Sequence, residues 1–574
     1  MPASKAKKPP KAAAGPSSPG RMATLPAPLG KGPRFDQYGK LMHRFFEPLI
    51  LLHTLGKTRG VHSPASVEEG SIEFTRKTFL DDLSYICDFE KGGQTTAAVA
   101  VEADSNRYIF WFALNKSSPK ITTFLESTLD IISGSIRATN AQGQGVVRNE
   151  FVAKLTRHCF EHARTRVKEE VRLLRGYIKG CRSFLAQESD AELANWLSRF
   201  QEGDDSEVCS LAFEHRQSEK MADIRNRGRQ SRFSSGAVLD MKFNNPFAAV
   251  HHFIGRIAHH VRAPKRLVES AQCFEQVLDS NYVVCRVPIL KRVPAPQPDD
   301  MTNLPSILNR MGVKDEETIE ALMELDRMHG IQERVLMQYQ NSNFEPTVHA
   351  EIHIHEHFFN APGGQKNFAF DLPVIGCSKP ACYCCKLYIK HHPARCVEPE
   401  SHENVWLKWS PPALPRGHLD AGFVGQRAVL QKMIEEIRRS AVEQIQARRG
   451  PGNSHPDSTT GITKLTRANL ARARGVGPSL AALSIQESPV EYQHWDGGSE
   501  YGEDGDTVHN PSRPGSSAGS GSSEIPSRSS LDFSPSPASH SPSAEVEESD
   551  ADSDDDDGGG VLLFKPRQQN WPRV

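Results

Sequence analysis

The sequence predicts an α/β core between two long low-complexity segments. Residues 78–90 and 151–180 place apolar side chains at helical spacing, which predicts amphipathic helices. Residues 107–115 and 281–290 are short apolar runs rich in β-branched and aromatic residues, which is typical of buried strands. Helices and strands are therefore both expected within the core.

Two tails of opposite charge flank this core. Residues 1–35 carry seven Lys or Arg and no acid, whereas residues 545–557 carry nine Asp or Glu. Pro, Gly, Ser and charged residues dominate both ends and bury too little apolar surface to fold. We expect a disordered basic tail over 1–34 and a disordered Ser/Pro/Asp-rich tail over 446–574. The basic run 5–11 is either part of a solvated tail or a nuclear address.

Length and cysteine content limit the class of protein. A chain of 574 residues is long enough for two or three domains with a large core. Its eleven cysteines are an odd number, and they are thinly spread except for one cluster. No secretory apolar segment is evident, and the apolar run 45–55 is too short to cross a bilayer. We expect an intracellular protein, cytoplasmic or nuclear, without membrane association and with one metal or redox site.

Two regions are expected between the tails. Residues 35–240 are mainly helical, and the Arg-rich stretch 216–236 predicts a loop. Residues 241–445 form the second region, in which 246–274 is a helical pair or one long helix and 300–340 is again helical. Four histidines occur at helical spacing without any thiol or carboxylate cluster, so we expect them to be structural or surface groups: His251, His252, His259 and His260.

Two short motifs in the second region contain residue types that bind metal ions. The chain has one His-x-Glu, at His349 and Glu351, and one Cys-x-x-Cys, at Cys382 and Cys385. Each motif alone is weak evidence for a zinc site, because His-x-Glu occurs by chance and Cys-x-x-Cys is also found in redox and structural sites. Together, in this order, they indicate a zinc site.

Zinc coordination explains this pairing of motifs. Two cysteines at i and i+3 on the first turn of a helix are neighbours, and the helix N-terminus favours their thiolate forms. Ser378 and Pro380 suit the start of such a helix. A single histidine as third ligand leaves the fourth tetrahedral position open for water, as in catalytic zinc sites. Glu351 is poorly placed as a second ligand from the same turn and well placed to face that water.

The same residues resemble a known superfamily. His349 to Glu351 followed by the cysteine motif is similar to the signature of the cytidine deaminase-like superfamily. More narrowly, segments 349–351, 375–385 and 402–412 resemble the Orientia-type deaminase family that is expanded in fungi. Looser similarity extends the resemblance over roughly residues 70 to 420.

This resemblance implies a three-layer α/β/α sandwich with a mixed sheet. It makes 241–445 a deaminase-like zinc domain with a helical insertion at 300–340. Residues 368–376 are then expected as the strand that enters the cysteine helix, and 404–409 as a following strand. It also assigns the roles: Zn²⁺ is the cofactor, His349, Cys382 and Cys385 are the zinc ligands, and Glu351 is the catalytic acid and base.

The sequence departs from the superfamily pattern at two positions. Ala381 separates Pro380 from Cys382, whereas the pattern has proline and cysteine adjacent, and Cys384 offers a competing thiol. Cys384 and Cys385 are adjacent and cannot both face one metal from a helix. We expect Cys377 and Cys384 to be buried small residues.

Periodicity alone does not decide whether residues 349–359 form a strand or a helix. As a strand, this stretch places His349, His353, His355 and His357 on one face, whereas as a helix it forms an apolar stripe beside a histidine stripe. The resemblance favours a helix with His349 at its start. The other three histidines are then expected either at the surface or in the layer of residues that surrounds the zinc ligands.

Three functions account for the motifs. The first is a zinc-dependent hydrolytic deaminase of cytosine or adenine, free or in nucleic acid, with nucleic acid or a nucleotide as its binding partner. The second is an inactive zinc-binding interaction or scaffold protein that recruits protein partners through its tails. The third, a thiol-disulfide oxidoreductase, leaves the His-x-Glu motif without a role. Trp406 and Trp409 would suit base stacking, but paired tryptophans in a strand are more often core residues.

Overall fold

A computed structural model describes residues 35–451, apart from 117, 143–145, 231–242, 244 and 361–363. All of these residues belong to one unit of the chain. The predicted tail 1–34 and residues 452–574 of the predicted tail 446–574 therefore lie outside the described residues, as does 231–236 of the predicted loop.

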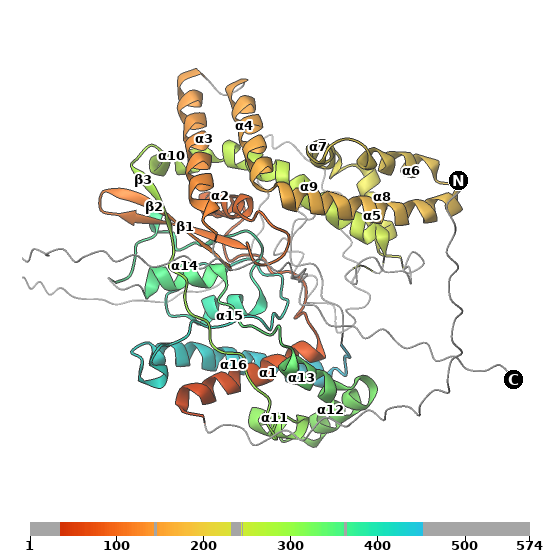
Figure 1. Ribbon diagram of the computed structural model, residues 1–574, viewed down its shortest axis with the longest axis vertical. Coiled ribbons are helices and arrows are strands. Elements are labelled where there is room, and N and C mark those ends of the chain that lie inside the picture. The colour runs from red at the N-terminus through yellow and green to blue at the C-terminus, as the bar shows by residue number, and fades with distance from the viewer. Residues whose placement is uncertain are drawn as a thin grey trace, which may run out of the picture. The chain divides into compact units, whose positions relative to one another are not determined.

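Four strands form a mixed sheet in the order β3-β2-β1-β4 (Figure 1). The central strands β1 (Ala97–Asp104) and β2 (Arg107–Leu114) form an antiparallel hairpin. Strand β3 (Tyr282–Arg286) extends the sheet beside β2 in parallel orientation. Strand β4 (Gly376–Cys377) pairs with the opposite edge of the hairpin, antiparallel to β1.

Helices cover both faces of this sheet. Helices α2 (Ile72–Cys87) and α3 (Lys120–Gln142) contact one face, and α14 (Ala350–Phe359) contacts the other. Side chains alternate along β1, so Val99 packs into the core under α2 while Ala98 packs into the core under α14. The predicted three-layer α/β/α arrangement is confirmed.

Further helices extend the layer that contains α14. Helix α15 (Tyr383–His391) contacts α14, and α16 (Phe423–Gln446) packs on both α15 and α1 (Gln37–Leu55). The predicted helical segment 300–340 contributes three helices to the same core: α11 (Leu304–Met311), α12 (Glu316–His329) and α13 (Ile331–Gln340). The first helix and the last described helix of the chain thus support the same layer.

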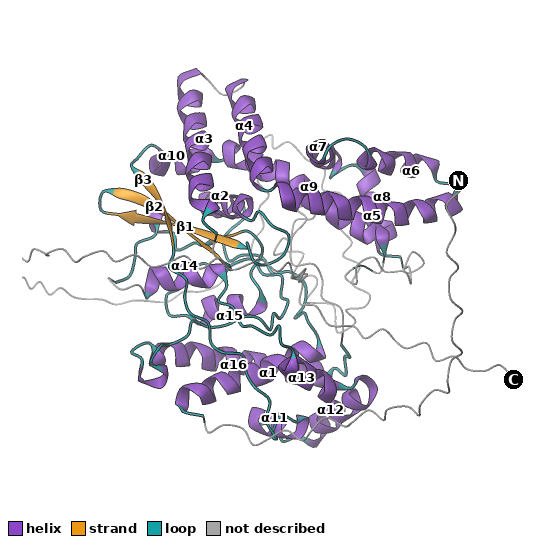
Figure 2. Cartoon of the chain, in the orientation of Figure 1, coloured by secondary structure: helices purple, strands orange, loops and turns teal. Residues whose placement is uncertain are grey.

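A helical subregion with its own apolar core lies between the hairpin and β3 in the sequence (Figure 2). Its long axis is α9 (Pro246–Glu269), which begins at the side-chain cap of Asn245 with a proline in its first turn. The helices before α9 all contact it or its neighbours: α4 (Val146–His162), α5 (Arg164–Glu188), α6 (Ala191–Ser198), α7 (Asp205–His215) and α8 (Glu219–Gly228). The short α10 (Glu275–Leu278) follows α9 and leads to β3.

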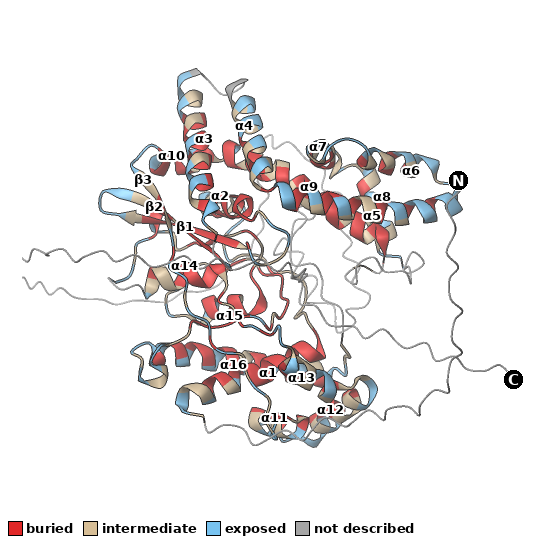
Figure 3. Cartoon of the chain, viewed as in Figure 1, coloured by how far each residue is buried: buried red, intermediate tan, exposed pale blue. Residues whose placement is uncertain are grey.

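A buried ionic network joins this subregion to the sandwich. Glu170 of α5, which is fully buried, contacts Arg166 Nε at 3.2 Å, Arg256 Nη2 at 2.6 Å and His260 Nε2 at 3.0 Å. Arg166 in turn lies 3.3 Å from Asp88, the residue that ends α2. Figure 3 colours the helices by burial. None of the four histidines of α9 is exposed, as expected for structural groups.

Three expectations about local structure are wrong. The predicted loop 216–236 contains α8, because Met221 and Ile224 are buried in the helical core. The predicted strand 368–376 is interrupted by a tight turn at 369–371 with positive φ at Phe370, so that only its two ends pair with β1, Phe368 as an isolated bridge to Glu102 and Gly376 opposite Val99. The predicted strand 404–409 is irregular, because its backbone bonds go to separate segments: Tyr383 N donates to Asn404 O and Val405 N donates to Lys57 O.

Candidate metal centre

The first motif opens helix α14. His349 is the N-cap residue, with extended backbone, and Ala350 begins the helix. The backbone N–H of Ala350 donates to Asn115 Oδ1 at 2.7 Å, and Asn115 directly follows β2. The sheet therefore fixes the start of α14, because an N–H that the helix leaves unpaired binds a side chain at the end of a central strand.

The second motif opens helix α15. Cys382 is the N-cap residue, and its Sγ accepts the backbone N–H of Cys385 at 3.5 Å. Sulfur here takes the role that a Ser or Asp oxygen usually has at this position. Both thiols are thus placed on the first turn, where the helix dipole favours negative charge.

Folding brings the histidine and the two cysteines together. Nδ1 of His349 lies 3.7 Å from Cys382 Sγ and 3.4 Å from Cys385 Sγ, and the three donor atoms all lie within 4.8 Å of one another. A tetrahedral zinc ion, with Zn–N of ~2.0 Å and Zn–S of ~2.3 Å, needs nitrogen and sulfur ligands ~3.6 Å apart. The donor set and its spacing therefore fit zinc.

The two thiols differ in their readiness to ionise. Burial opposes ionisation of Cys382, but the hydrogen bond from Cys385 and the proximity of His349 outweigh it and lower its pKa to about 6. The pKa of Cys385 is raised well above its usual value, first by burial and then by the Cys382 thiolate and Glu351. Cys382 is thus the more readily ionised of the two thiols, and binding a cation to both would also require loss of the Cys385 proton.

Glu351 faces the same group of residues. Its side chain is buried, and its carboxylate raises the pKa values of Cys382, Cys385 and Cys377 in addition to the effect of burial. Glu351 is not a member of the three-residue donor group. Its influence on both thiols places Glu351 beside the donor group.

The remaining cysteines and histidines of the motifs lie elsewhere. Cys384 is fully buried and lies outside the donor group, and Cys377 is only partly buried. Of the two places expected for His353 and His355, the surface is excluded, since both are buried. His353 Nδ1 accepts the backbone N–H of Leu290 at 3.2 Å.

A second group of three donors lies farther along α14. His355, Glu356 and His392 have donor atoms within 4.8 Å of one another. Tyr388 OH donates to Glu356 Oε1 at 2.8 Å, and Ala394 N donates to His392 Nδ1 at 3.2 Å. That second bond leaves the proton of a neutral His392 on Nε2, which lies 4.0 Å from Glu356 Oε1.

Sequence reasoning missed two residues that support the centre. Trp409 is fully buried, and its Nε1 donates to Cys385 Sγ at 3.1 Å. Asn115 tethers α14. The apolar run before Asn115 predicts the strand, but nothing in the sequence places its end beside His349.

Part of the chain matches a known protein family. Residues 348–413, which include both motifs, match the model of the OTT_1508-like deaminase family (OTT_1508_deam). The match supports a deaminase assignment for this segment and is consistent with the cytidine deaminase-like superfamily. It is shorter than the expected 70–420. No curated protein and no solved structure matches the chain.

Within residues 35–451, excluding the undescribed gaps, no helix combines the length and the apolar character that crossing a bilayer requires.

Proposed function

We propose that the protein is a zinc-dependent hydrolytic deaminase of a nucleobase, cytosine or adenine. The observation that carries this proposal is the meeting of His349, Cys382 and Cys385 at the starts of two helices, with Glu351 beside them. The match to a deaminase family over the same segment supports it.

The roles of the residues follow from their positions. His349, Cys382 and Cys385 would hold the zinc ion, which when bound lowers the pKa of water and so makes hydroxide available at neutral pH. Glu351 accepts the proton of the attacking water and delivers it to the ring nitrogen of the base. It then takes the proton of the hydroxyl that has added to the ring carbon and passes it to the exocyclic amine, so that the C–N bond breaks, ammonia leaves and a carbonyl remains.

The alternative, a zinc-binding scaffold, is less well supported by the donor set. A structural zinc site is closed by four protein ligands. The donor group found in the described part of the chain has three members, and the neighbouring acid is one suited to proton transfer. Three ligands leave a position for water.

The test is an ammonia-release screen with purified, zinc-loaded protein. Nucleobases, nucleosides, nucleoside monophosphates, single-stranded DNA and RNA are each incubated with wild type and with Glu351→Gln, and bound zinc is measured for both. We expect ammonia from one substrate class with wild type alone, at equal zinc content. Absence of ammonia from every class, or equal release by Glu351→Gln, would contradict the proposed function.

A further inference from the structure

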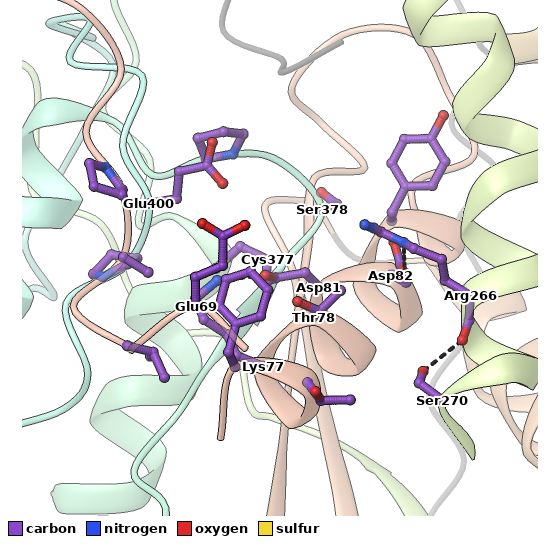
Figure 4. Close-up of a pocket in the computed structure, with 18 of the residues that line it drawn as sticks. Glu69, Lys77, Thr78, Asp81, Asp82, Arg266, Ser270, Cys377, Ser378 and Glu400 are labelled. Atoms are coloured by element: carbon purple, nitrogen blue, oxygen red, sulfur yellow. Dashed lines mark hydrogen bonds and ion pairs between the residues drawn. The ribbon is translucent and has the colours of Figure 1, made fainter. Parts of the chain in front are cut away.

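Two features outside the candidate metal centre could bind a ligand: a pocket and the second group of three donors. The pocket has a volume of about 1190 Å³ and is lined by α2, the end of α9 and residues 375–380 (Figure 4). Its lining carries charges of both signs, and ion pairs such as that of Arg266 with Asp82 engage several of them, so charge selects no ligand. The members of both donor groups lie outside its lining. The second donor group therefore carries the inference.

The second donor group joins helices α14 and α15. His355 and Glu356 lie in the second half of α14, and His392 ends α15 as its C-cap residue. Glu356 Oε1 lies 3.4 Å from His355 Nδ1 and 4.0 Å from His392 Nε2. Two imidazole nitrogens, one from each helix, thus face the same carboxylate oxygen.

Hydrogen bonds within the group do not satisfy these side chains. The His355 ring is fully buried, and neither of its nitrogens has a hydrogen-bond partner within the described part of the chain. The 4.0 Å gap between His392 and Glu356 is too long for a hydrogen bond. A buried imidazole without a partner is costly, and a bound cation is one way in which proteins satisfy such a group.

The protonation states of the group suit a cation. Burial and then His355 lower the pKa of His392 to about 4, so this imidazole is neutral at pH 7. Burial opposes ionisation of Glu356, but the contact with His355 and two hydrogen bonds outweigh it and lower its pKa. Neutral imidazole and ionised carboxylate are the forms in which these side chains bind metal ions.

The carboxylate of Glu356 is also held in position. Tyr388 OH donates to its Oε1 at 2.8 Å, and Asn360 Nδ2 donates to its Oε2 at 2.8 Å. Carboxylate ligands of metal ions are oriented by outer hydrogen bonds of this kind. The side chains of Glu356 and His392 are 11% and 10% exposed, so solvent reaches the group.

Metal binding requires one change at His392. Its Nδ1 accepts the backbone N–H of Ala394 at 3.2 Å, so a neutral ring carries its proton on Nε2. Binding through Nε2 moves that proton to Nδ1 with no net change in protonation, and the Ala394 N–H turns to solvent, which the partial exposure of Ala394 allows. This exchange, together with a donor set without thiolate, predicts weaker binding than at the cysteine centre.

We propose that His355, Glu356 and His392 form a second metal site, which binds a divalent transition-metal ion when free metal is supplied. Two imidazoles and one carboxylate suit transition-metal ions such as Zn²⁺ and Fe²⁺, whereas Mg²⁺ and Ca²⁺ prefer oxygen ligands. His349 and the two cysteines join the starts of α14 and α15, and the second site joins the same helices farther along. An ion in each site clamps the helix pair at two places.

Titration with Co²⁺ tests the site without turnover. The full chain, with zinc in the cysteine centre and excess Mg²⁺ to occupy the acidic run 545–557, is titrated in a calorimeter. Co²⁺ does not displace the zinc, because it binds a given site more weakly. We expect one further Co²⁺ per chain in wild type. Glu356→Gln and His392→Ala should each weaken this binding at least about ten-fold, since ligands matter at least as much as the groups that orient them.

His391→Ala is the matched control. His391 is next to His392 in sequence, but its Nε2 lies 2.7 Å from Glu436 and outside the donor group, so this variant should bind Co²⁺ like wild type. The absorption spectrum identifies the centre that is filled, because thiolate ligands give Co²⁺ strong near-ultraviolet bands that imidazole and carboxylate do not. Circular dichroism shows whether the variants are folded.

Anomalous diffraction at the cobalt edge locates the ion in wild type and decides the site even where a variant does not fold. We expect the cobalt peak between His355, Glu356 and His392. Wild type that takes up no further Co²⁺, folded Glu356→Gln and His392→Ala that bind it unchanged, or cobalt found at other positions alone would each overturn the proposal.

Discussion

The indole N–H of Trp409 donates a hydrogen bond to Cys385 Sγ across 3.1 Å inside the core. A donor aimed at a sulfur ligand stabilises the thiolate and fixes its direction, as partners behind metal ligands do in general. This contact links the end of the family-matched segment to its metal motif.

Replacing Trp409 tests this contact. Trp409→Phe keeps an aromatic ring but loses the donor, so zinc affinity should fall about ten-fold or more. Competition with a chromogenic chelator measures it. Trp406→Phe is the matched control, because the Trp406 indole donates to His402 Nε2 and not to a proposed ligand. Equal affinities for the two variants would contradict the role of Trp409.

Cysteine substitutions test which thiols hold the metal. Cys382→Ala and Cys385→Ala should each abolish stoichiometric zinc binding, because two remaining donors cannot close the site. Cys384→Ala should retain one zinc ion per chain, since Cys384 lies outside the donor group. Metal analysis after gel filtration gives the stoichiometry. Zinc loss in Cys384→Ala, with the protein still folded by circular dichroism, would argue against the assigned ligand set.

Glu170 should be essential for stability. Burial opposes its ionisation, but Arg256, Arg166 and His260 outweigh that cost and hold its pKa well below the usual value. Glu170→Gln leaves two buried cations poorly compensated, so the free energy of unfolding should fall by about 3–5 kcal/mol. Denaturant unfolding measures it. Glu169→Gln, next in sequence but in an exposed pair with Arg172, should cost about 0–1 kcal/mol.

His53 should make the protein sensitive to acid. Burial, followed by Lys57 and Arg59, lowers its pKa from 6.5 to about 3. In the unfolded chain the His53 imidazole is therefore protonated below about pH 6.5, whereas in the folded protein it stays neutral down to about pH 3. The free energy of unfolding consequently declines as the pH falls from 6.5 towards 3. This residue should account for about 2 kcal/mol between pH 6.5 and pH 5. Between these two pH values, the free energy of unfolding of His53→Leu should decrease by that amount less than the free energy of unfolding of wild type. Equal decreases in the two proteins would refute the role of His53.

Local pattern predicted much of the secondary structure. The apolar run at 107–115 forms β2, and the helical spacing at 78–90 lies largely within α2. Strand β1, rich in alanine, was not expected, because its pairing with β2 rather than its composition makes it a strand. The strand prediction for 404–409 was wrong for the converse reason: the segment is largely buried, but within the described part of the chain its ends form only isolated bridges, to Thr58 and Thr347.

The sequence by itself determined the donor types and their local spacing. Cys382 and Cys385 meet because residues three apart on one helical turn are neighbours wherever the helix lies. Only the tertiary structure decided that 349–359 is a helix, that His349 lies 3.4 Å from Cys385, and that Asn115 and Trp409 support them. Those relationships join segments far apart in the chain. They depend on how the sheet and its covering helices pack, which no local period encodes.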